Sequence, residues 1–86
     1  MTNNNDTRHE VMAFLATITR PGFDITSFSD DTNLVDEGAI DSFALIQVIF
    51  FLEEEHGLNL QAAGIDPADL ISVDGILAAV EQAETQ

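Results

Sequence analysis

A single serine stands out among the residues that could do chemistry. Ser42 directly follows Asp41, at the start of the most apolar stretch of the chain. A hydrolytic serine needs a base within hydrogen-bond reach. His56 lies further along the same predicted helix, about 21 Å away at 1.5 Å per residue, and no pattern recommends His9. We therefore expect no catalysis by this chain and interpret Ser42 as an acceptor, not as a nucleophile of its own reaction.

The charge balance excludes several classes of function. The 86 residues include 16 Asp and Glu but only 2 Lys and Arg, both of them arginine, for a formal net charge of −14. Binding to nucleic acid or to an anionic membrane surface needs clustered cations, which are missing. No run reaches the roughly 18 apolar residues of a membrane span, and no signal peptide is visible. We expect a cytoplasmic protein that neither binds nucleic acid nor inserts into a membrane.

Metal and thiol chemistry are also not expected. The chain has no Cys, and two histidines cannot form a zinc site alone. The acidic loop that starts at Asp30 lacks the calcium-binding pattern, because Val35 stands where the sixth-position glycine is required. We therefore predict no metal site.

Hydrophobic periodicity predicts helices joined by turns, in one domain over residues 1–86. Residues 1–6 and 81–86 are polar and are expected to be frayed tails. Thr7 and Glu10 fit a capping box at the start of a first helix, which should end at Arg20-Pro21-Gly22. Four apolar residues form one face of this helix: Val11, Phe14, Leu15 and Ile18.

The remaining segments predict a long connection and further helices. Residues 21–41 should form a loop with a short helical turn, held to the core by scattered apolar residues: Phe23, Ile25, Phe28, Leu34, Val35 and Ile40. Asp66-Pro67 should open a short third helix near Leu70 and Ile71, and Ser72 should cap a last helix. The expected fold is all-α, a small four-helix bundle with three longer helices, a short third helix and a long first loop.

The second predicted helix has more apolar residues than one core face needs. It should begin at Asp41-Ser42 and run to His56, before Gly57. At about 100° per residue, one face holds a sufficient core stripe of Leu45, Val48, Ile49 and Leu52. Phe43, Ile46 and Phe50 lie on the side of Ser42, and a domain this small cannot bury both faces. We therefore predict an exposed apolar patch beside Ser42, which is typical of an interaction site.

Two stretches resemble the carrier-protein family, which comprises acyl, peptidyl and D-alanyl carrier proteins. They are DEGAIDSF at residues 36–43 and EEEHGL at residues 53–58. The resemblance extends over nearly the whole chain through its length, helix order, long first loop and acidity. It implies that Ser42 carries 4′-phosphopantetheine from coenzyme A, that Asp41 is the motif acid, and that the arm's thiol holds an acyl or aminoacyl group as a thioester. It also implies a phosphopantetheinyl transferase, an activating ligase and a downstream transferase as partners.

Departures from the family pattern bear on the cargo. Two residues separate Gly38 from Asp41 where fatty-acid carriers usually have one, and Phe43 replaces their usual leucine. Early acidic residues of that helix are replaced by Ala44 and Gln47. These features resemble D-alanyl and stand-alone aminoacyl carriers more closely, so we expect a monomeric stand-alone carrier.

Two interpretations stay open for the surface. Phe43, Ile46, Gln47, Phe50, Glu53 and Glu54 are candidate contacts for a partner or the cargo. The simpler interpretation of the apolar residues among them is ordinary core. The simpler interpretation of the glutamates is a solvated face. On the helix, Glu53 and Glu54 should lie on the Ser42 side, and Glu55 should face away. The alternative function is a non-catalytic helical interaction or dimerisation module in which Ser42 is only a helix cap.

Overall fold

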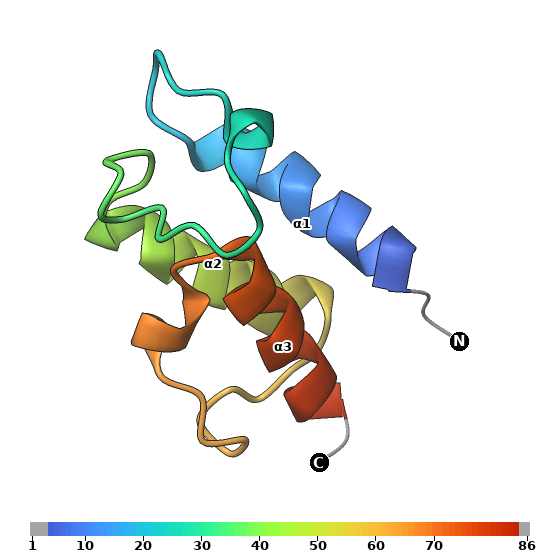
Figure 1. Ribbon diagram of the computed structural model, residues 1–86. Helices are drawn as coiled ribbons and strands as arrows, with labels where there is room; N and C mark the ends of the chain where they lie inside the picture. Colours follow the sequence, from blue (N-terminus) through green and yellow to red (C-terminus); the bar gives the residue numbers. More distant parts are fainter. Residues whose placement is uncertain (1–3, 85–86) are drawn as a thin grey trace.

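The computed structural model describes residues 4–84, which form three α-helices and two short 3-10 turns. The elements in chain order are α1 (Asn4–Ile18), η1 (Ile25–Ser27), α2 (Ser42–Glu55), η2 (Pro67–Leu70) and α3 (Val73–Glu84) (Figure 1). No strand occurs in this range, so the all-α prediction is confirmed. The four-helix bundle is not confirmed, because the expected third helix is the single 3-10 turn η2. None of the described helices combines the length and apolar character needed to cross a membrane.

Helix α1 begins earlier than predicted. It starts at Asn4, so the expected boundary at Thr7 is wrong and Thr7 lies inside the helix, where it is buried. The pair Thr7 and Glu10 therefore does not form a capping box, because Thr7 is buried within the helix. Residues 81–84, expected to fray, continue α3. The rest of the two expected tails, residues 1–3 and 85–86, lies outside the described residues.

The core gathers residues from all three helices and from the connections. Its largest fully buried side chains are Val11, Leu15, Leu34, Ile40, Val48, Leu52, Leu70 and Ile76. Helix α1 packs against α2 and α3, and η2 packs against both α2 and α3. The predicted core stripe of α2 is confirmed for Val48 and Leu52, whereas Leu45 and Ile49 are only partly buried against the core.

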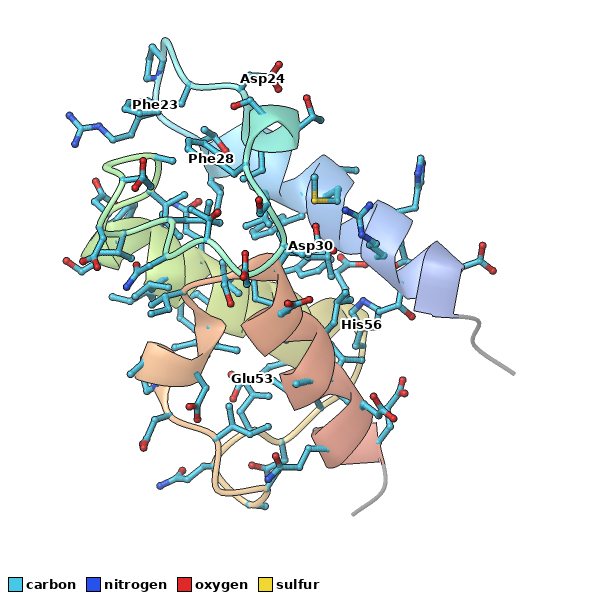
Figure 2. All side chains as sticks on the ribbon, viewed as in Figure 1. Phe23, Asp24, Phe28, Asp30, Glu53 and His56 are labelled. Atoms are coloured by element: carbon cyan, nitrogen blue, oxygen red, sulfur yellow. The ribbon has the colours of Figure 1, made fainter. Side chains whose placement is uncertain are left out.

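The long connection between α1 and α2 is fixed by its own core contacts. Leu34 is fully buried, its N–H donates to the Ile71 carbonyl at 2.8 Å, and its carbonyl accepts from Ala39 at 3.0 Å. Figure 1 shows this segment arching from the end of α1 to the start of α2. Phe23 was predicted to anchor the connection, but it is 42% exposed. It stacks instead on Phe28 at the outer end of the loop (Figure 2).

The backbones of η2 and α3, the last two elements, lie close together where Asp69 faces Gly75. The N–H of Asp66 donates to the Asp69 carboxylate at 3.0 Å, with Pro67 at the first position of η2. The Ser72 Oγ then accepts from the Gly75 N–H at 3.0 Å, which confirms Ser72 as the cap of α3. A Cβ at Gly75 would press against the Asp69 carbonyl oxygen. Because a new helix is capped so soon after Leu70, η2 cannot extend beyond one turn.

Candidate functional site

Asp41, and not Ser42, caps helix α2. Asp41 has extended backbone geometry, and its Oδ1 accepts a hydrogen bond from the Ala44 N–H at 2.9 Å. Ser42 is the first helical residue, and its side chain is exposed. The Ser42 hydroxyl forms no hydrogen bond with any residue in the described part of the chain. Of the two residues predicted to cap this helix, Asp41 does so and Ser42 does not, and the Ser42 side chain is exposed.

Buried neighbours hold Asp41 and Ser42 in place. Ile40 comes directly before them and is 1% exposed, and Ala44 follows two residues after Ser42 and is 5% exposed. The Arg20 N–H donates to the Ala39 carbonyl at 2.8 Å, which ties the end of α1 to the same segment. The two residues between Gly38 and Asp41 are thus core anchors, and the serine is an exposed position between rigid ones.

The start of α2 offers unpaired donors beside the serine. Within the described chain, the backbone N–H groups of Ser42 and Phe43 have no acceptor, as is usual for the first turn of a helix. These groups and the helix dipole favour an anion at this end. A phosphate ester on the Ser42 Oγ would place its charge next to them.

Neither histidine is placed to activate Ser42. His56 is at the other end of α2, where its Nε2 is 3.3 Å from the Glu10 Oε2 of α1 (Figure 2). That contact lacks hydrogen-bond geometry, so the buried Nε2 has no hydrogen-bond partner among the described residues. His9 lies on α1, in a depression that Ile25 and Thr26 of η1 also line. The site therefore presents an exposed hydroxyl with neither histidine beside it.

Three large apolar side chains of α2 are exposed, as predicted. Phe43 is 66%, Ile46 47% and Phe50 55% exposed. We refer to these three residues as the apolar strip. Because its side chains are exposed, the apolar strip is not ordinary core. The strip begins at Phe43, the residue next to Ser42. A role of the strip in binding a partner or cargo remains a prediction.

The polar candidates of α2 divide between two sides of the helix. Glu53 is exposed and lines a depression with Ile49 and Leu60, on the side of the 57–66 segment (Figure 2). Glu54 lies on the opposite side, with Gln47, facing α1. Glu55 was expected to face away, but it shares the side of Glu54. The sequence predicts that Glu53 and Glu54 share one side of the helix, whereas in the structure Glu54 shares its side with Glu55.

An open groove of about 630 Å³ is lined by α1 and by the second half of α2. Phe14 of α1 and Phe51 of α2 stack in it, with ring centroids 4.2 Å apart. Ala13 and Phe50 complete its apolar surface. We refer to it as the α1–α2 groove. Sequence reasoning missed it because periodicity assigns residues to faces of one helix and does not say which faces of two helices meet.

Two carboxyl groups with lowered pKa values, Asp24 and Asp30, lie in the connection between α1 and α2. The Arg8 guanidinium donates to Asp30 at 2.7 and 3.1 Å and holds the pKa of that carboxyl below its usual range. The Thr26 hydroxyl, with the Thr26 backbone N–H, lowers the pKa of Asp24. Among residues 4–84 no three His, Cys, Asp or Glu side chains are grouped to hold a metal ion. These carboxylates have structural partners within the loop and α1.

No model of a known protein family matches the sequence, no curated protein is significantly similar to it, and no solved structure matches it. The function is therefore inferred from the residues of the site.

Proposed function

We propose that this chain is a carrier protein whose Ser42 is esterified with 4′-phosphopantetheine from coenzyme A. The observation that carries the proposal is the exposed hydroxyl of Ser42 at the first position of α2, which has no hydrogen-bond partner among residues 4–84, with Asp41 in the capping role. A serine that served only as the helix cap would accept a hydrogen bond from a first-turn N–H group with its Oγ. Here Asp41 takes that task, and the Ser42 Oγ is available to a transferase.

The residues of the site fit a phosphodiester. The Ser42 and Phe43 N–H groups and the positive end of the α2 dipole would face the phosphate charge. Ile40 and Ala44 are buried on either side, so the attachment point would be held rigidly relative to the domain. When bound, the arm supplies a terminal thiol that carries the cargo as a thioester, which a chain without cysteine cannot supply itself.

The chain itself contributes no catalysis in this proposal. Neither histidine lies beside Ser42 and the Asp41 carboxylate caps α2, so in this proposal the transferase removes the hydroxyl proton while the serine–phosphate bond forms and adenosine 3′,5′-bisphosphate leaves. An activating ligase would load the thiol with an acyl or aminoacyl group, and a downstream transferase would remove it. The Gly38-to-Asp41 spacing and Phe43 favour an aminoacyl cargo on a stand-alone carrier. We expect this carrier to be monomeric and cytoplasmic.

The fold is compatible with this role in a modified form. The carrier family has a four-helix bundle with a short third helix, and η2 would occupy the place of that helix here. The apolar strip of Phe43, Ile46 and Phe50 would contact partner enzymes or the cargo. Gln47, Glu53 and Glu54 would flank those contacts, and the net charge of −14 would draw basic enzymes toward them.

The second candidate function is a helical interaction or dimerisation module. The exposure of the apolar strip favours it, because exposed apolar side chains on a small protein mark contact surfaces. In that case Ser42 would have no role beyond its place in the first turn of α2. The two candidates differ in one chemical property, the covalent modification of Ser42.

Intact mass spectrometry separates them. The purified chain is incubated with coenzyme A, magnesium and a phosphopantetheinyl transferase of broad specificity. We expect one added phosphopantetheine on wild type, none on Ser42→Ala and one on Ser29→Ala, which removes an exposed serine from the loop. An unmodified wild type, or an addition that persists in Ser42→Ala, would leave the interaction module as the better explanation.

A further inference from the structure

We infer that the α1–α2 groove is a docking site for a cationic amphipathic helix of a partner protein. This inference does not depend on the modification of Ser42. The groove lies over the second half of α2, and Phe50 is about 12 Å along the helix axis from Ser42 at 1.5 Å per residue. It is lined by Glu10, Ala13, Phe14, Gln47, Phe50, Phe51, Glu54 and Glu55.

The shape of the groove fits a helix. Along α2 its lining residues form two rows spaced by four positions, Gln47–Phe51–Glu55 and Phe50–Glu54. The opposite wall is α1, where Glu10 and Phe14 are also four positions apart. The floor between these walls is apolar, with the stacked rings of Phe14 and Phe51 at its centre. A third helix with apolar side chains at i, i+3, i+4 and i+7 would lie along such a floor.

The small side chain of Ala13 makes room for this occupant. It is exposed on α1, at the wall of the groove, one residue before Phe14, whose partly buried ring stacks on Phe51. The exposed ring of Phe50 provides the matching apolar wall on α2. A larger side chain at position 13 would project into the hollow without any change of charge.

Charge selects the chemistry of the occupant. Three carboxylates line the groove, from Glu10, Glu54 and Glu55, and no Lys or Arg does. Of the two arginines of the chain, Arg8 is paired with Asp30, and Arg20 is at the far end of α1 from Glu10. Glu10 lies against His56, but neither Glu54 nor Glu55 pairs with a cationic group among residues 4–84. An occupant with lysine or arginine on either side of its apolar face would neutralise these two carboxylates.

The three carboxylates gather at one end of the groove. Glu54 and Glu55 are in the last turn of α2, where the helix dipole adds to their negative charge. Glu10 is brought to the same end, because its Oε2 lies 3.3 Å from the Nε2 of His56, the C-cap of α2. We therefore expect the cations of the partner helix to concentrate at one of its ends and apolar residues to fill the rest.

A second copy of this chain does not fit the groove. Each copy carries a net charge of −14 and would bring its own rim of glutamates to the interface. Like charges placed opposite each other disfavour association. The occupant is therefore a partner of opposite charge, and self-association through the groove is an outcome that the test must exclude.

The test uses a synthetic peptide of leucine and lysine, with leucines at i, i+3, i+4 and i+7, and a second peptide with glutamate in place of lysine. Binding is measured by fluorescence anisotropy at about 0.15 M salt, where long-range attraction is screened beyond about 8 Å. Amide chemical shifts of the labelled chain locate the site. We expect the lysine peptide alone to bind, with the shifts changing along the groove.

Matched variants separate the groove from the charge of the whole chain. Ala13→Leu should weaken peptide binding at least about tenfold, a change of about 1.4 kcal/mol. Ala16→Leu, the same change on an exposed residue of α1 outside the groove, should have no effect. The triple variant Glu10→Gln, Glu54→Gln, Glu55→Gln should weaken binding more than the triple variant Glu37→Gln, Glu81→Gln, Glu84→Gln. Thermal melting checks that each variant is folded.

Three results would overturn the inference. The first is equal loss of binding in the two triple variants, which would mean that the peptide follows net charge alone. The second is evidence that the peptide binds outside the groove, either from shifted amides that lie elsewhere or from unchanged binding by Ala13→Leu. The third is a dimer in sedimentation that Ala13→Leu dissociates, which would identify a second copy as the occupant. Loading of Ser42 should be the same in Ala13→Leu and Ala16→Leu, which change neither the charge nor a residue assigned to the carrier's partner contacts, so failure here is distinguishable from failure of the carrier proposal.

Discussion

Truncation of Phe50 should cost far less stability than truncation of Leu52, although the two residues are neighbours on α2. Phe50 is 55% exposed and Leu52 is 0% exposed. Full burial of a phenylalanine side chain contributes about 1.5–3 kcal/mol, and Phe50 buries somewhat less than half of its surface. Phe50→Ala should therefore lower the free energy of unfolding by about 1 kcal/mol. Leu52→Ala should lower it by about 2–5 kcal/mol, because it also leaves a cavity.

The assay is urea unfolding followed by far-ultraviolet circular dichroism, with both variants and wild type under one set of conditions. The slope with denaturant should be the same in all three, because neither change alters the surface exposed on unfolding by much. A loss in Phe50→Ala as large as that in Leu52→Ala would refute the reasoning. It would mean that the strip is packed in solution and that the exposed surface of α2 is not available to a partner.

The functional half of the same prediction uses Phe50→Glu. The variant should remain folded, because the side chain projects from the exposed side of α2. It should slow the transfer of cargo between the carrier and a partner enzyme, because a desolvated carboxylate replaces an apolar contact. Initial transfer rates with wild type and Phe50→Glu give the measurement. Global unfolding of the variant would show that the strip belongs to the core.

Substitutions at three further residues test local contacts of the fold. Gly75→Ala should lower the free energy of unfolding by about 1–3 kcal/mol despite the better helix propensity of alanine, because its Cβ would press against the Asp69 carbonyl oxygen; an unchanged melting temperature would contradict that packing. Because Arg8 holds the pKa of Asp30 below its usual range, the pair stabilises the fold above about pH 4 and loses this effect as the pH falls through the lowered pKa. Acid titration of Arg8→Gln should therefore show a smaller loss of stability than wild type, and equal losses would contradict the pairing. Asp41→Ala should lower the free energy of unfolding in urea by about 1 kcal/mol. Asp41→Asn should lower it less, because asparagine keeps an oxygen that can accept from the Ala44 N–H. Equal losses in the two variants would show that this capping hydrogen bond does not stabilise the fold.

Local signals in the sequence were enough to predict α2 and its exposed side. The Asp41 cap and Gly57, which adopts a φ of +64°, bound the helix within one residue of the prediction. Phe43 and Phe50 could be placed outside the core because a small domain can bury only one face of a helix. The exposed serine follows from the same boundary, since the residue after the cap is the first of the helix.

Features that depend on contacts between elements were less predictable. The apparent capping box at Thr7 gave way to burial of that side chain within α1. The short third helix became η2, because Ser72 caps α3 so soon afterwards. The α1–α2 groove, with Glu55 on its rim, depends on how two helices are rotated toward each other, which hydrophobic periodicity does not determine.

The most direct test of the carrier proposal is the intact mass of the chain after incubation with coenzyme A and a phosphopantetheinyl transferase. The proposal predicts a single added phosphopantetheine on wild type, located on Ser42 by fragmentation and absent from Ser42→Ala. It also predicts that the added arm presents a thiol that a thiol-specific reagent labels, in a chain that has no cysteine. An unmodified wild type, with a known carrier protein modified in the same mixture, would contradict the proposal.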